Sequence, residues 1–238
     1  MRAKLRLVAA TAGILALFVF AASAAASVNK SIKIEAGSTS DGAETVNGSI
    51  SIGSDAIVSG SVETVNGTIK VGDGANIEDA QTVNGSLRLG NRVKTEDLSS
   101  VNGAVRVGEE SVVDGEVSVV NGTITVGNAT TVSRDVSNVN GQIRLSGAEV
   151  RGDLTTATGD VVLEDGAVLL GDLTVEKPSG YTTSKRKPRV TIGPGSRVMG
   201  TIKIEHEVDL FISNTAEVGS VSGVMDMDDA VRFDGSRP

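Results

Sequence analysis

The tripeptide Val-Asn-Gly occurs six times between residues 46 and 141, at nearly fixed intervals. The copies begin 18 or 19 residues apart, and two degenerate copies, Val-Asn-Lys at Val28 and Ala-Thr-Gly at Ala157, extend the series at both ends. A repeat this short cannot bury an apolar face alone, so successive repeats must stack on one another. The period therefore predicts a solenoid over most of the chain.

The apolar residues inside each repeat indicate strands. An apolar-x-apolar pair begins four residues after each repeat start: Ile32/Ile34, Ile50/Ile52, Ile69/Val71, Leu87/Leu89, Val105/Val107, Ile124/Val126, Ile143/Leu145 and Val161/Leu163. A second, looser set follows: Ala56/Val58, Ala75/Ile77, Ala129/Val132, Ala148/Val150 and Ala167/Leu169. A third apolar position recurs at Val62, Ala80, Leu98, Val117, Val136, Leu154 and Leu173. This alternation is typical of strands with one buried face.

These patterns predict an all-β fold, a single-chain parallel β-solenoid of roughly triangular section with one repeat per coil. Helices are a poor alternative because the segments are rich in Val, Ile, Thr and Gly and show no apolar stripe at helical spacing. With coils stacked about 4.8 Å apart, ten coils would form a rod of about 50 Å.

The Asn-Gly pairs are expected at a corner of each coil. We expect positive φ there, which Gly adopts freely and Asn tolerates, at a place where a Cβ atom would be a hindrance. Stacking should also align the amides into a hydrogen-bonded ladder with a structural role; a row of polar ligands is the alternative. The predicted ladder residues are Asn47, Asn66, Asn84, Asn102, Asn121 and Asn140.

Two charged columns are expected on the outside of the rod. Residues between the first apolar pairs give a basic stripe, the candidate contact stripe: Lys33, Lys70, Arg88, Arg106 and Arg144. Residues preceding the third apolar position give an acidic column: Asp79, Asp97, Glu116, Asp135, Asp153 and Asp172. Like charges stacked so closely repel. Either repeat duplication left these columns in solvent, or they pair with a neighbouring rod or an anionic polymer.

Residues 1–26 have the pattern of a cleaved signal peptide. Arg2, Lys4 and Arg6 precede the apolar stretch 7–20, and Ala22-Ser23-Ala24 has the spacing of a cleavage site, with cleavage expected after Ala24 or Ala26. The stretch is short for a membrane span, and no later segment is apolar enough to be one. We therefore expect an exported protein, periplasmic or at the cell surface, without a transmembrane segment after signal removal.

Composition excludes several partners. The chain carries a net charge of −8, which disfavours nucleic-acid binding, and it has no cysteine for disulfides. No metal-ligand cluster of known spacing occurs, and no cofactor is expected. The only histidine, His206, lies between Glu205 and Glu207, an arrangement more typical of a surface ion pair than of a general base. The protein is therefore predicted not to be an enzyme.

The regular solenoid is expected to span residues 27–176, followed by a basic loop at 177–189 and irregular last coils at 190–222. The loop carries the candidate contact residues Tyr181, Lys185, Arg186 and Lys187, and its alternative role is a solvated connection. The acidic tail, 223–238, either caps the last coil or is disordered.

The short V-x-G-x-[IV]-x-[IV] coils, together with "GAVLLGDLTV", "GSRVMGTIKI" and "ATTVSRDVSN", resemble the bactofilin (polymer-forming cytoskeletal) family over residues 28–222. This resemblance implies a right-handed β-helix that polymerises through its ends without nucleotide. The export signal departs from the cytoplasmic location typical of that family. The N-G-[ST]-[IL] turns are also similar to those of bacterial putative adhesin domains.

Two functions are therefore expected, in order. The first is a non-enzymatic, self-assembling structural protein of the cell envelope, forming a homo-oligomer or polymer. The alternative is an adhesin-like module that binds an anionic glycan or polymer, such as an envelope polysaccharide, through many weak contacts.

Overall fold

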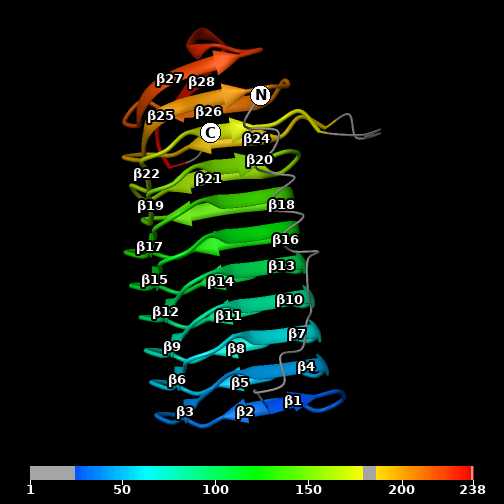
Figure 1. The fold of residues 1–238 in the computed structure, drawn as a ribbon. Coiled ribbons are helices and arrows are strands. Elements are labelled where there is room, and N and C mark those ends of the chain that lie inside the picture. Colours follow the sequence, from blue (N-terminus) through cyan, green and yellow to red (C-terminus); the bar gives the residue numbers. More distant parts are fainter. Residues whose placement is uncertain (1–24, 179–185, 237) are drawn as a thin grey trace.

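The computed structural model describes residues 25–178, 186–236 and 238, which form a rod of parallel β-strands wound into about ten turns (Figure 1). Every strand pairing between coils is parallel. Three strands recur in each coil, so the rod has three faces. The predicted parallel β-solenoid is confirmed.

Equivalent strands stack into columns that define the faces. The first face contains β1 (Ala25–Ser27), β4 (Ala43–Asn47), β7 (Val62–Asn66), β10 (Ala80–Asn84), β13 (Leu98–Asn102), the first parts of β16 (Val117–Val126) and β18 (Val136–Ser146), β20 (Leu154–Thr156), β23 (Leu173–Val175), and the second parts of β25 (Arg197–Ile204) and β27 (Glu217–Gly223).

The second face contains β2 (Ile32–Ile34), β5 (Ile50–Ile52), β8 (Ile69–Val71), β11 (Leu87–Leu89), β14 (Val105–Val107), the second parts of β16 and β18, β21 (Asp160–Glu164), β24 (Arg189–Ile192), β26 (Asp209–Ser213) and β28 (Val231–Phe233).

The third face contains β3 (Thr39–Ser40), β6 (Ile57–Val58), β9 (Asn76–Ile77), β12 (Lys94–Thr95), β15 (Val112–Val113), β17 (Thr131–Val132), β19 (Glu149–Val150), β22 (Val168–Leu169), and the first parts of β25 and β27. A 3₁₀ turn, η1 (Met227–Asp229), joins β27 to β28.

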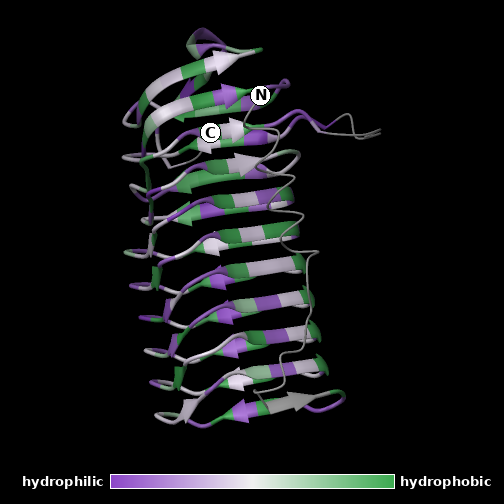
Figure 2. Cartoon of the chain, viewed as in Figure 1, coloured by the Kyte–Doolittle hydropathy of each residue, from purple (hydrophilic) through white to green (hydrophobic). Residues whose placement is uncertain are grey.

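The core is one continuous apolar column inside the rod. Alternate residues of most strands are buried, and the hydropathy colouring of Figure 2 shows hydrophobic and hydrophilic positions alternating along the strands. The predicted first pairs are buried, except that Ile32 in the first coil is half-buried. One prediction from the second set is wrong: Ala129 is exposed at a corner with φ 55°, and Thr130 takes its buried place.

The residues of the repeat Thr-Val-Asn-Gly differ in burial and in hydrogen bonding. Thr64 is fully buried, and its hydroxyl donates a 2.9 Å hydrogen bond to the carbonyl oxygen of Gly48 in the preceding coil. The following Val65 is half-buried and Asn66 is exposed. Since burying a hydroxyl without a partner is costly, the bond to the preceding coil explains why a polar residue is acceptable inside.

The glycine of the repeat is required by close stacking rather than by positive φ. A Cβ atom on Gly85 would lie 1.7 Å from the carbonyl oxygen of Gly67, and one on Gly103 would lie 1.6 Å from that of Gly85. Among the six Val-Asn-Gly copies, only Gly141 has positive φ (123°). The expected Cβ hindrance is present, but the expectation of positive φ at this corner is wrong for the other five copies.

Positive φ occurs instead at the corner between the second and third faces. The residues there include Gly37, Asp55, Gly74, Arg92 and Glu110, with φ between 55° and 71°. The left-handed region is costly for non-glycine residues, yet three of these five have side chains. The stacked coils impose positive φ at this corner, so residues other than glycine also adopt it and the sequence at the corner varies.

The asparagines form the predicted amide ladder over most of their column. Each Nδ2 donates to the Oδ1 of the asparagine one coil earlier, at 2.8–3.1 Å, from Asn47 bonded to Asn29 up to Asn121 bonded to Asn102. Asn140 is in register with Asn121, but its Oδ1 accepts from Thr158 Oγ1 at 3.3 Å instead. Asn29, from the degenerate copy, extends the ladder by one position.

The ends of the fold differ in detail from the predicted boundaries. Strand β1 begins at Ala25, so cleavage after Ala24 would leave it whole, whereas cleavage after Ala26 would remove two of its residues. The rest of the predicted signal peptide lies outside the described residues. The tail continues the coil, because β28 pairs with β26 after the capped turn η1. No described helix is long and apolar enough to cross a membrane.

We predict that Asn84→Ala combined with Asn102→Ala lowers the melting temperature, because three consecutive amide bonds are lost. At about 0.5–1.5 kcal/mol for each of the three bonds, the combined cost is about 1.5–4.5 kcal/mol. Differential scanning calorimetry would measure the shift. Asn76→Ala, on the third face and outside the ladder, serves as the control; a double variant as stable as the control contradicts a structural role for the ladder.

Candidate functional site

The basic stripe lies on the second face, as predicted. Strand register places Lys33, Ser51, Lys70, Arg88 and Arg106 next to one another in consecutive coils. Thr125 and Arg144 continue the column, and all seven side chains lie outside the core. At the parallel-strand spacing of about 4.8 Å, the three cations from Lys70 to Arg106 form an unbroken row.

The cations at the two ends of the stripe have carboxylate partners, and the three in its middle do not. Lys33 Nζ lies 2.9 Å from Glu35 Oε1, and Arg144 Nη1 lies 2.7 Å from Glu164 Oε1. Within the part of the chain that the structure describes, no carboxylate lies within 4.0 Å of the charged nitrogens of Lys70, Arg88 or Arg106. We call these three residues the unpaired basic row.

The row is flanked by small residues, two of which, Thr68 and Ser86, carry hydroxyl groups. Two residues before each cation, Thr68, Ser86 and Ala104 form a neighbouring outward column, and two residues after each cation, Gly72, Gly90 and Gly108 form another. Glycine leaves one side of the row without side chains, and the hydroxyls offer hydrogen-bond donors and acceptors on the other. Because the flanking side chains are small, the three cations are accessible to a ligand.

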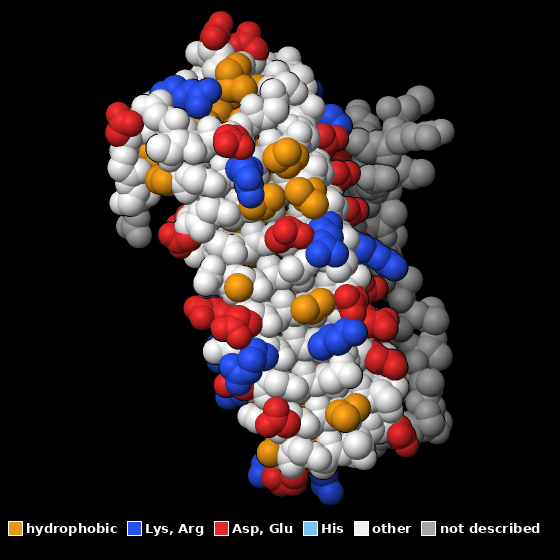
Figure 3. Space-filling model, turned by 90° about the vertical axis from the view of Figure 1, so that its left-hand side faces the viewer, with side chains coloured by type: hydrophobic (Ala, Val, Ile, Leu, Met, Phe, Trp, Pro, Cys, Tyr) orange, Lys and Arg blue, Asp and Glu red, His pale blue; other side chains and the backbone are white. Residues whose placement is uncertain are grey.

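Other faces distribute charge differently. On the side of the rod seen in Figure 3, positive and negative side chains are mixed rather than aligned. On the third face, Lys94 and Arg151 have carboxylates within 3.2 Å, at Asp114 and Glu149. The three stacked cations without carboxylate partners lie on the second face.

A groove of about 820 Å³ continues the stripe on the second face, over β18, β21 and β24. Its walls carry Arg144, Asp160, Glu164, Arg186, Lys187 and Arg189. The groove therefore brings together the last residue of the predicted stripe and two residues of the predicted contact loop. The other two loop residues, Tyr181 and Lys185, lie outside the described residues.

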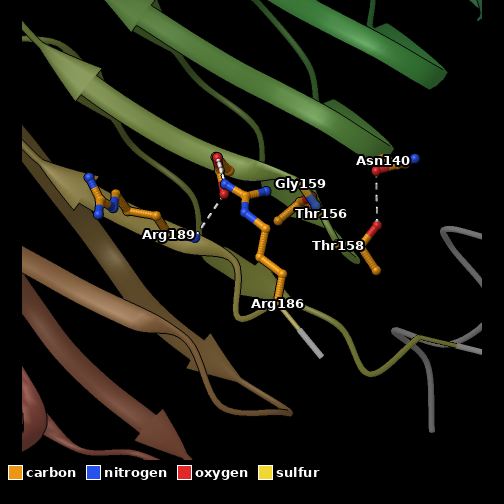
Figure 4. A network of polar contacts seen from close by, with 7 residues as sticks. Asn140, Thr156, Thr158, Gly159, Arg186 and Arg189 are labelled. Carbon is orange, nitrogen blue, oxygen red and sulfur yellow. Dashed lines mark hydrogen bonds and ion pairs between the residues drawn. The ribbon is translucent and has the colours of Figure 1, made fainter. Parts of the chain in front are cut away.

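Three of the groove cations, Arg144, Arg186 and Lys187, are paired with carboxylates of neighbouring coils. Arg186 pairs with Asp160, which also accepts a 2.9 Å hydrogen bond from the backbone N–H of Arg189 (Figure 4). Lys187 Nζ lies 2.7 Å from Glu207 Oε2, and this pair raises the pKa of Lys187 and lowers that of Glu207. An anion entering the groove would compete with these carboxylates, which makes the groove weaker than the unpaired basic row for anion binding.

The acidic column has a structural use that the sequence analysis missed. Asp79 Oδ1 accepts a hydrogen bond from the backbone N–H of Asp97 in the next coil at 3.1 Å. The same bond, at 2.8–3.0 Å, joins Asp97 to Glu116, Asp135 to Asp153, Asp153 to Asp172 and Asp172 to Thr201. A sequence signal existed: the column prefers Asp to Glu, and only the shorter side chain reaches the adjacent amide.

Glu116 is the exception in this column. No side chain of the described residues accepts from the backbone N–H of Asp135 at this position. Burial, reinforced by the nearby Asp97 and Asp135 carboxylates, raises the pKa of Glu116 above its ordinary value, although Arg134 opposes the shift. A charged Glu116 therefore destabilises the folded rod.

His206 is half-buried, and the expected ion pair with its neighbours is not formed. Glu205 accepts from the backbone N–H of Lys177 at 3.1 Å, and Glu207 pairs with Lys187. Burial lowers the pKa of His206, partly offset by a backbone hydrogen bond involving Glu176 and by Glu205. No group of three or more His, Cys, Asp or Glu side chains among the described residues is placed to hold a metal ion.

No protein-family model matches the chain, and no curated protein or solved structure is significantly similar to it. Inferences about function therefore rest on the fold and the surface of the protein.

We predict that Glu116→Gln stabilises the protein at neutral pH. The folded pKa of Glu116 is raised, so its proton is bound more tightly in the folded state, and stability falls as pH rises above the ordinary glutamate pKa. The stabilisation should therefore disappear in acid, where Glu116 is protonated in both states. Denaturant unfolding across pH would measure it. The exposed Glu109→Gln is the control; equal effects of the two changes at neutral pH would refute the explanation.

Proposed function

We propose that the protein is a non-enzymatic, exported structural rod of the cell envelope that self-assembles end to end. The observation that carries the proposal is that, among the strands that the structure describes, those of the first and last coils pair on one edge only. Strands β1, β2 and β3 each pair with one neighbour, in β4, β5 and β6. At the other end, β27 pairs with β25 and β28 pairs with β26, and no further described strand covers them.

Exposed apolar side chains at the ends support this proposal. Val28 in the first coil is 65% exposed, and Val224 and Val231 near the last coil are 58% and 54% exposed. An open edge with apolar side chains favours pairing with another chain. A second copy would satisfy the backbone groups and bury these valines in the same contact. The bactofilin resemblance, which implies polymerisation through the ends, agrees with this mode of assembly.

Assembly through the ends predicts a concentration-dependent series of linear species. We expect sedimentation velocity and negative-stain microscopy of the purified exported protein to show them, and their persistence in high salt because apolar contacts are not screened. Val224→Lys with Val231→Lys should reduce association. Ile57→Lys, on the third face away from the ends and 49% exposed in the parent, is the matched control. An elongated monomer at every concentration would refute end-to-end assembly.

The unpaired basic row favours a second function, binding of a linear anionic polymer along the second face. Two unit charges in water about 5 Å apart repel by slightly under 1 kcal/mol, so stacking Lys70, Arg88 and Arg106 without carboxylates costs stability. A polyanion lying along the rod would remove that repulsion and could contact several coils, so that weak contacts add up. The flanking hydroxyls could hydrogen-bond to a glycan.

Arg88→Glu combined with Arg106→Glu is expected to weaken binding of a linear polyuronate about tenfold or more, and the parent's affinity should fall as salt rises. Lys94→Glu with Arg197→Glu makes the same change in net charge on the third face and is the control. Isothermal titration calorimetry with polygalacturonate, and with neutral dextran for comparison, measures the affinity of each variant and the salt dependence of the parent's affinity. Equal losses in the two variants would show an effect of net charge alone and would remove the row from consideration.

A further inference from the structure

The six Asn-Gly pairs bring a reactive sequence to the surface of the rod. In such a pair, the backbone nitrogen of glycine can attack the side-chain carbonyl carbon of asparagine, because glycine has no side chain to obstruct it. The new C–N bond closes a five-membered succinimide and ammonia leaves. Water then opens the ring to aspartate or isoaspartate. The reaction needs a freely rotating asparagine side chain and a glycine N–H that is not held in a hydrogen bond.

Hydrogen bonds restrain the asparagine side chain in the first five pairs and the glycine N–H in the first four. The side-chain amide of each asparagine from Asn47 to Asn121 donates to the asparagine of the preceding coil. The N–H of the glycine that follows donates to the asparagine carbonyl of the next coil at 3.1–3.2 Å in the first four pairs: Gly48, Gly67, Gly85 and Gly103. In the fifth pair, Gly122 lies inside β16 and is paired with Gly141 of β18.

The sixth pair, Asn140 and Gly141, lacks the side-chain amide bond to the preceding coil and the glycine N–H bond to the next coil. Among the described residues, the Asn140 side-chain nitrogen donates no hydrogen bond, and the Gly141 N–H makes none of this kind to the next coil. Within the described part of the chain, the side chain of Asn140 makes one hydrogen bond, the 3.3 Å bond that its Oδ1 accepts from Thr158 Oγ1 (Figure 4). Gly141 also has a different backbone conformation from the other five glycines, with φ 123°.

The repeat is lost in the coil that follows this pair. Where Val-Asn-Gly would be expected, the chain has Ala157, Thr158 and Gly159. Pairing of β18 with the next coil stops after Ser137 and resumes at Gln142. Asn140 is therefore the last asparagine of the column, with no amide above it.

We propose that Asn140 is a site of spontaneous deamidation in the folded protein, and that the five earlier asparagines of the Val-Asn-Gly copies are protected by the ladder. The product places a carboxylate on the exposed end of the ladder. In the isoaspartate form the main chain gains one methylene group within β18, where the regular coils meet the irregular ones. This inference is independent of the proposed function.

Peptide mapping by mass spectrometry, after incubation of the folded protein in mildly alkaline buffer, tests the proposal. We expect Asn140 to convert about tenfold or more faster than each of the other five, because local opening must precede reaction at a hydrogen-bonded site. In denaturant all six should convert at similar rates. Conversion of Asn140 no faster than the others in the folded protein would overturn the proposal.

A variant separates the missing ladder position from other properties of this coil. Thr158→Asn places an amide next to Asn140 in the column and is expected to slow conversion of Asn140. Thr158→Val removes the hydroxyl without supplying an amide and should not slow it. Equal rates at Asn140 in these two variants, with both shown by circular dichroism to be folded, would refute protection by the ladder.

Discussion

The in-register parallel hydrogen bonding between coils is the constraint on which the rest of this protein depends. It places each residue directly above its equivalent in the preceding coil, so every position of the repeat becomes a column running along the rod. A column is acceptable only where identical or similar groups tolerate a spacing of about 4.8 Å. Glycine at the Val-Asn-Gly corner follows from this directly, because any Cβ atom would overlap a carbonyl oxygen of the preceding coil.

The three polar columns satisfy this constraint in different ways, and hydrogen-bonding capacity explains the difference. An amide has both donors and acceptors, so asparagines can bond to copies of themselves. A carboxylate only accepts, and the aspartates therefore bond to backbone N–H groups of the next coil. Lysine and arginine only donate, and the middle of their column has no acceptor from the described residues. That unmet capacity makes the second face the best candidate for binding.

Polar groups without a partner in the neighbouring coil, and the groove, occur where the repeat is interrupted. The coil that begins at Ala157 has no asparagine to continue the column beyond Asn140, and the groove that joins Arg144 to Arg186 and Lys187 lies over the strands that surround it. Where a column stops, groups that were bonded to a neighbouring coil become available to solvent or to another molecule. The same reasoning applies to the first and last described coils, whose strands pair with a neighbouring described coil on one edge only.

The sequence alone determined the solenoid, the three strands per coil, the apolar core and the asparagine column, because a strict period and strand alternation allow few other ways to bury these residues. Only the tertiary structure decided which corner has positive φ, that the aspartates bond to backbone amides, and that the stripe and the loop meet in one groove. These properties depend on distances between coils, which the order of residues does not contain. Ala129 shows why the sequence was insufficient here. Its apolar side chain suits the core, but the backbone at the corner turns it outward.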